Sequence, residues 1–182
     1  MAHTLDRIFL TASAKNLDQL LSRVRDCVGK LATDEIWARG HENENAIGNL
    51  LLHLNGNVRQ WIIAGVGGAA DTRARDAEFA ACGGIEAAEL LQKLEATMHE
   101  AMAILPKVTA ERLAERVTIQ KYEVTVLEAI FHVVEHFSQH TGQIIFATKM
   151  LTGEDLGFYK HLRRAALHGE DSAGSAPGSA LP

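Results

Sequence analysis

The chain has 182 residues, of which 47% are hydrophobic and 23% are charged, proportions that fit one globular domain and argue against a disordered chain. Its 18 Lys and Arg stand against 23 Asp and Glu, a net charge of −5, so we expect no nucleic-acid partner. The N-terminus does not resemble a secretory signal and no apolar run reaches the roughly 20 residues of a membrane span, which favours a cytoplasmic protein without a membrane partner.

Apolar residues at helical spacing predict four long helices, over about residues 5–29, 46–64, 85–105 and 124–151. Asn45 is a suitable N-cap for the second helix. Pro106 cannot continue the third, and Gly153 follows the fourth. The chain is therefore expected to be all-α.

The segments between these helices are less regular. Residues 71–84 combine alternating charges with glycines, which indicates a long crossover loop between the second and third helices. Residues 117–124 alternate only weakly, so we interpret them as an extended connector rather than a strand. The predicted fold is a four-helix bundle with this long crossover, formed by one domain over residues 1–167, and residues 168–182 are a small, polar C-terminal tail.

Three histidines recur every four residues in the predicted fourth helix: His132, His136 and His140. Successive members lie on one stripe, and two neighbours can reach the same metal ion. The outer two are separated by about 12 Å along the axis, so one helix does not supply three ligands. A third ligand should come from another helix.

His53 supplies that ligand, because it lies within the apolar run Leu50–Leu54 where an unpaired imidazole is costly to bury. The alternative is that these histidines bind no metal and are simply hydrogen-bonded in the core or exposed on the surface. A pair of histidines at ligand spacing, together with a third in the middle of another helix, favours a metal site instead. Polar residues on the same stripes predict a pocket that orients the ligands or binds substrate: Asn49, Asn57 and Gln60 beside His53, and Gln143 beside His136 and His140.

A competing motif overlaps the histidine stripe. His132, Glu135 and His136 match the HxxEH pattern of inverted zincins, in which two histidines bind zinc and the glutamate is the base. That site needs a further acidic ligand from downstream, and only the loop-like stretch at Glu154 and Asp155 offers one. We therefore favour the site that includes His53.

Two blocks of the chain, 45–61 and 136–144, resemble the DinB/YfiT-like superfamily, and the resemblance extends to 73–79 and 153–159. It spans roughly Leu5 to Tyr159. The resemblance implies a four-helix bundle, often dimeric, with a divalent metal such as nickel, zinc or iron on three histidines. Residue by residue, these are His53, His136 and His140, which leaves His132 in the pocket or second shell.

Some members of this superfamily are similar to transferases or isomerases that use bacillithiol, mycothiol or glutathione, and many others are called metal-dependent hydrolases. The resemblance thus implies an enzyme whose metal activates a thiol or water for S-transfer or hydrolysis of a small molecule. Because a shared fold does not confer a reaction, the second hypothesis is a non-catalytic metal-binding bundle, structural or stress-linked. We also expect a homodimer through the fourth helix, where Phe131, Gly142 and Phe146 project away from the core.

Overall fold

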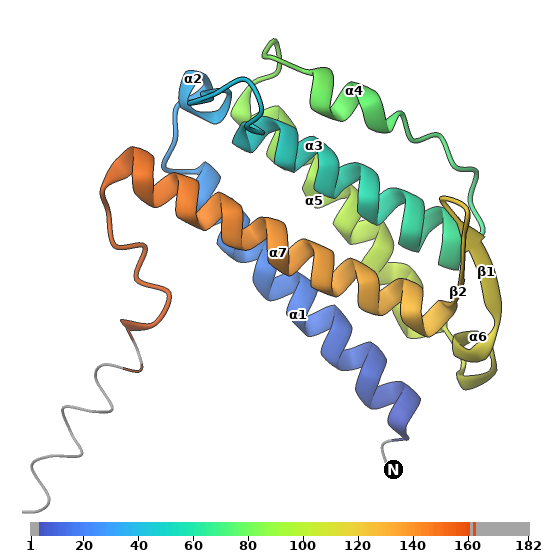
Figure 1. The fold of residues 1–182 in the computed structure, drawn as a ribbon. Helices are drawn as coiled ribbons and strands as arrows, with labels where there is room; N and C mark the ends of the chain where they lie inside the picture. The colour runs from blue at the N-terminus through green and yellow to red at the C-terminus, as the bar shows by residue number, and fades with distance from the viewer. Residues whose placement is uncertain (1–3, 161, 163–182) are drawn as a thin grey trace, which may run out of the picture.

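The computed structural model describes residues 4–160 and 162, and this part of the chain is mostly helical, which confirms the all-α prediction. The long helical segments are α1 (Leu5–Val28), α3 (Ile47–Val58) with its continuation η1 (Arg59–Val66), α5 (Ala87–Ile104) and α7 (Val126–Thr152) (Figure 1). The short ones are α2 (Thr33–Ile36), α4 (Arg75–Ala80), η2 (Leu105–Lys107) and α6 (Ala110–Ala114). The predicted tail, residues 168–182, lies outside the described residues.

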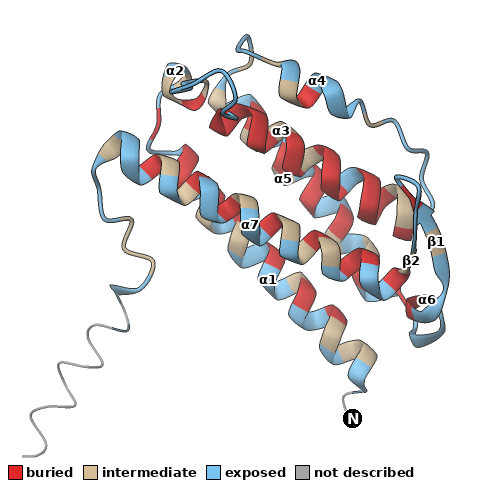
Figure 2. Ribbon diagram, in the orientation of Figure 1, coloured by how far each residue is buried: buried red, intermediate tan, exposed pale blue. Residues whose placement is uncertain are grey.

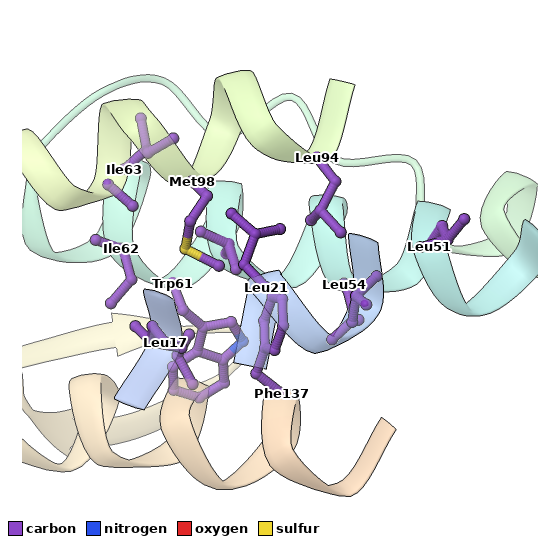
Figure 3. Packing of buried hydrophobic residues seen from close by; sticks show 14 of the residues in the cluster. Leu17, Leu21, Leu51, Leu54, Trp61, Ile62, Ile63, Leu94, Met98 and Phe137 are labelled. Atoms are coloured by element: carbon purple, nitrogen blue, oxygen red, sulfur yellow. The ribbon is translucent and has the colours of Figure 1, made fainter. Parts of the chain in front are cut away.

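The long segments pack side by side around one core. In Figure 1, α3 and α5 run in the same direction, so the chain between them returns along the outer side of α3, where α4 packs. As a result α3 is buried on almost every side (Figure 2). Among the described residues, no helix combines the length and the hydropathy that a membrane crossing needs. Figure 3 shows the core side chains meeting between the helices, among them Leu17 and Leu21 of α1, Leu54 of α3, Trp61 of η1, Met98 of α5 and Phe137 of α7.

Helix α7 carries two of the predicted ligands, and both of its ends are specified locally. The Thr125 hydroxyl accepts a hydrogen bond from the Glu128 N–H at 3.2 Å, and the Glu128 carboxylate accepts one from the Thr125 N–H at 2.6 Å. This reciprocal capping box satisfies amides that have no partner within the helix. Gly153 ends the helix with φ of 68°, a left-handed conformation that glycine adopts without steric cost. The predicted end at Gly153 is confirmed.

Helix α3 begins differently from the prediction. The residue before its first turn is Ala46, not Asn45, and its backbone N–H donates to Asn49 Oδ1 at 3.0 Å. The Asn49 side chain, one turn inside the helix, therefore satisfies the backbone N–H of the N-cap residue, a different arrangement from the side-chain cap expected of Asn45. At the other end the helix widens into the π-helical turns of η1, which end at Gly67 and Gly68. Single π-helical turns are frequent beside functional sites.

The segment predicted as a connector is a β-hairpin, so that prediction was wrong. Strands β1 (Arg116–Ile119) and β2 (Tyr122–Thr125) pair antiparallel with Ile119 opposite Tyr122. The two turn residues, Gln120 and Lys121, have φ of 50° and 71°, values that hairpin turns normally obtain from Asn-Gly or Asp-Gly. Without those residues, the sequence lacked the usual hairpin signal.

The crossover also differs in detail from a plain loop, because residues 75–80 form the short helix α4. One residue of α4, Glu78, is buried. This burial brings a carboxylate from the crossover against the face of α3 that carries His53.

Candidate metal centre

Helices α3 and α7 bring the three predicted ligands together. His53 Nε2 lies 3.0 Å from His136 Nε2, and His140 Nε2 lies 3.2 Å from the same atom. One ring nitrogen from each histidine falls within 4.8 Å of the other two. His53 is buried on α3, whereas His136 and His140 are half-buried one turn apart on α7. The spacing of four residues thus supplies two neighbouring side chains, and helix packing supplies the third.

His53 is held from its outer side by a carboxylate that the sequence analysis did not single out. Glu78 Oε2 lies 2.9 Å from His53 Nδ1. Arg73 donates to both oxygens of Glu78, from Nε to Oε1 and from Nη2 to Oε2, each at 2.7 Å. The pair is buried, with only 3% of the Arg73 side chain and 10% of the Glu78 side chain exposed. Both residues lie in the 73–79 block of the family resemblance, which was the one available signal.

Gly56 provides the space that this ion pair occupies. It lies one turn after His53 on α3, and a Cβ atom there would collide with Glu78 Oε1 and approach Arg73 Nε to 2.9 Å. Any larger residue would displace the carboxylate. Gly56 is therefore a requirement of the contact between the crossover and α3, despite the helix-weakening effect of glycine.

The hydrogen bonds made by the outer ring nitrogens of His53 and His140 determine the tautomer of each ring. The tautomer in turn decides whether the inward nitrogen has a free lone pair. Burial by itself would raise the pKa of Glu78, but hydrogen bonds from Arg73 and His53 outweigh it and hold the pKa below the usual range. Glu78 Oε2 is nearer to His53 Nδ1 than Arg73 Nη2 is, at 2.9 against 3.1 Å, and a carboxylate only accepts, so we assign the proton of His53 to Nδ1. His140 Nδ1 likewise donates to Gln143 Oε1 at 2.6 Å. Both rings then present an unprotonated Nε2 to the centre of the cluster.

The histidines of α7 are kept neutral by their surroundings. Burial, followed by repulsion from His140, His53 and His132 if they were charged, lowers the pKa of His136 to about 3. Burial also lowers the pKa of His140. Neutral imidazole is the form that binds metal ions.

The donor set fits a divalent ion. Two imidazoles at Zn–N distances of about 2.0–2.1 Å on a tetrahedral ion would hold their nitrogens roughly 3.4 Å apart. The observed separations of 3.0 and 3.2 Å are close to that value. Two unprotonated nitrogens, of His53 and His140, thus face His136 Nε2 in a partly buried space, an arrangement that a divalent cation can bridge. The buried Nδ1 of His136 has no hydrogen-bond partner within the described part of the chain, so this ring, unlike those of His53 and His140, is not oriented from its outer nitrogen.

His132 is separated from this cluster. Its ring lies against Trp61, with centroids 4.1 Å apart, and its Nε2 is 3.4 Å from Asn57 Nδ2. It does not belong to the group of nitrogens that converge. Glu135, the acidic residue of the alternative HxxEH motif, is exposed. The structure thus offers His53, rather than this glutamate, as the neighbour of the α7 histidines.

The predicted polar residues fall into two groups. Gln143 lies beside His140, on the stripe where it was expected, whereas Asn57, expected beside His53, contacts His132 on α7. Asn49 and Gln60 instead form hydrogen bonds with residues of the crossover. The Asn49 amide donates to the backbone oxygens of Glu78 and Ala81 at 2.9 and 2.8 Å. Gln60 accepts from Arg73 Nη1 at 3.0 Å and donates to Asp71 at 2.7 Å. They position Glu78 and Arg73 rather than the ligands themselves.

The model of the family described as "Protein of unknown function (DUF1572)" matches residues 5–162. The chain belongs to this family. DUF1572 is a DinB/YfiT-like family, and the resemblance seen in the sequence is confirmed. No curated protein matches the chain.

Two solved structures share the fold of this DUF1572 member. A conserved protein from Enterococcus faecalis superposes with a TM-score of 0.68 at 15% sequence identity, over 79% of this chain and 97% of that protein. A mutant of the mycothiol-dependent maleylpyruvate isomerase superposes with a TM-score of 0.55 at 11% identity, over 74% of this chain and 60% of the isomerase. Identities this low establish a common fold and no more.

Proposed function

We propose that the protein is a cytoplasmic metal-dependent enzyme in which His53, His136 and His140 hold one divalent ion, zinc, nickel or iron. The chemistry that such an ion would supply is activation of a low-molecular-weight thiol, or water, for attack on a small-molecule substrate. The observation that carries this proposal is the convergence of three imidazole nitrogens from two helices, with Glu78 and Gln143 on the outer nitrogens of two of them. We also infer that the long helical segments form a four-helix bundle of the crossover type, with residues 67–86 as the crossover.

If bound by these three imidazoles, a divalent ion would supply a Lewis acid that lowers the pKa of a thiol or water molecule. The protein's own residues orient this chemistry. Glu78 fixes the His53 ring and increases its basicity, and Gln143 fixes the His140 ring. We favour S-transfer over hydrolysis, because the fold is shared with an isomerase named as mycothiol-dependent.

His132 is the side chain that can receive the proton released by the thiol or water. Burial lowers its pKa, so the ring is neutral near pH 7 and can accept a proton. Its centroid is 5.4 Å from that of His136, close enough for transfer through one water molecule. Asn57 and Trp61 hold the ring in place.

The function is tested by loading the protein with zinc, nickel or iron and assaying glutathione, bacillithiol and mycothiol with an aryl halide, and water with an activated ester. We expect turnover with at least one thiol, and a loss of at least about 100-fold in His136→Ala. His99→Ala, a change on α5 away from the cluster, is the matched control and should keep full activity. Stoichiometric metal without turnover on any probe would instead support the non-catalytic metal-binding module.

We also propose a homodimer through the outer face of α7. Phe131 is 57% exposed and a Cβ added at Gly142 would meet no atom, so the face is open at both positions. Phe146, also expected at this interface, is 67% exposed but lines a cavity next to Gln143, so the proposed interface is centred on Phe131. Sedimentation at micromolar concentration should give a dimer for the wild type and for Phe131→Leu, and a monomer for Phe131→Asp. A monomeric wild type would remove this proposal.

A further inference from the structure

A cavity of about 760 Å³ opens beside the histidine cluster, at the end where α3 begins and α7 ends. Its volume lies within the range of roughly 300–1,000 Å³ that is usual for small-molecule sites. One wall is the second half of α7, and the others are the first turns of α3 and the segment 38–45. Gln143 belongs to the α7 wall and accepts the hydrogen bond from His140 Nδ1. The cavity therefore begins one side chain away from a proposed metal ligand.

The α7 wall is apolar and accessible. Phe146, Met150 and Leu151 are 67%, 72% and 42% exposed, although large apolar side chains are normally covered. Ile47 and Leu50 of α3 face them across the cavity. Covering the exposed side chains of the α7 wall with the apolar part of a ligand would be favourable, at a location separated from His140 by the Gln143 side chain.

Arg39 contributes one positive charge to the cavity lining, which also contains the carboxylates of Glu35 and Glu44. Its Nη2 donates to Asn49 Oδ1 and to the backbone oxygen of Ala81, both at 2.8 Å, and within the described part of the chain it forms no ion pair. Neither carboxylate is paired with Arg39 within the described residues, and each accepts a backbone N–H instead. Glu44 accepts from the Gly40 N–H at 2.7 Å, and Glu35 accepts from the Ala32 N–H at 2.8 Å. The remaining N–H groups of Arg39 can thus receive a carboxylate from a ligand.

We infer that this cavity binds a small organic acid, with the apolar part of the acid on Phe146 and Met150 and its carboxylate on Arg39. That this acid is the substrate rests on the proposed function, whereas its binding does not and can be measured without turnover. The binding assay and the activity assay can therefore fail separately.

The test is calorimetric titration of zinc-loaded and chelator-treated protein with 4-phenylbutanoate and with its neutral isostere 4-phenylbutanamide. We expect the acid to bind about tenfold more tightly than the amide in both forms of the protein. Arg39→Gln should bring the acid down to the affinity of the amide, and Arg25→Gln, at an exposed arginine of α1 outside the cavity, should not change either affinity. Met150→Glu should weaken the acid about tenfold relative to Met150→Gln, which changes polarity without charge.

Three results would overturn the inference. The first is equal affinity for the acid and the amide in the wild type. The second is acid binding that disappears with the chelator but persists in Arg39→Gln, which would assign the carboxylate to the metal. The third is a dimer that Met150→Glu dissociates, since a second copy of the chain would then cover the cavity wall. Arg39→Gln also removes the hydrogen bond from Arg39 to Asn49. Met150 is exposed, so its variants test the site without changing that hydrogen bond.

Discussion

Replacing His53, His136 or His140 singly with Ala is expected to reduce bound metal from about one ion per chain to almost none, whereas His132→Ala should retain it. The reason is that the first three histidines converge, while the His132 ring lies against Trp61. Elemental analysis of the purified variants measures the metal content. Circular dichroism in parallel shows whether each variant keeps its helices.

The same variants can be compared by thermal unfolding with added zinc. A ligand that binds only the folded state, at about 100 times its Kd, raises the free energy of unfolding by about 2.7 kcal/mol. The wild type and His132→Ala should show this stabilisation, and the three ligand variants should not. Equal loss of metal in all four variants would contradict the assignment of the ligands.

Glu78→Gln is expected to weaken metal binding by about 10- to 100-fold while leaving all three histidines in place. The change removes the charge that orients His53 through the 2.9 Å hydrogen bond. It also leaves the Arg73 guanidinium buried without its counter-charge, which typically costs about 3–5 kcal/mol of stability. Chelator competition gives the metal affinity, and urea unfolding of the metal-free protein gives the stability.

Two further variants separate orientation of the ligand from stability. Gly56→Ala should weaken metal binding in the same direction, because its Cβ displaces Glu78. Gly142→Ala on α7 is the matched control, and it should stabilise the protein by about 0.5–1 kcal/mol with no change in metal affinity, because open space surrounds its Cβ. Combining Glu78→Gln with Arg73→Gln should restore part of the stability but not the affinity. Unchanged metal affinity in both Glu78→Gln and Gly56→Ala would show that Glu78 does not orient the ligand.

The arrangement of the histidines was largely predictable because it follows from local periodicity. Residues four apart on a helix lie on one face, so His136 and His140 had to be neighbours once α7 formed. His53 was conspicuous because an imidazole in an apolar run requires a partner. The choice of His140 over His132 did not follow from spacing, since both are one turn from His136, and came from the family resemblance. The structure brings His140 to His136 and places His132 beside Trp61.

The carboxylate behind His53 could not be derived in this way. Glu78 lies in a charged, glycine-flanked segment with no apolar period, and nothing local indicates that one of its acids is buried. Its position depends on the contact of the crossover with α3 at Gly56, more than 20 residues earlier in the chain. The β-hairpin escaped prediction for a related reason. Its turn uses two residues that rarely adopt positive φ, and Ile119 of the hairpin packs where Gly65 leaves room for it.

By itself, the sequence determined the helical class, the lengths of the long helices and the histidines that each one presents, because helical periodicity and helix-ending residues act over one or two turns. Only the tertiary structure decided how α3, α7 and the crossover meet. That packing buries the Arg73–Glu78 pair against Gly56, sets the tautomer of His53 and leaves the cavity at Arg39 open beside His140. Contacts between segments far apart in the chain depend on the complementary shapes and charges of whole elements, which no local pattern records.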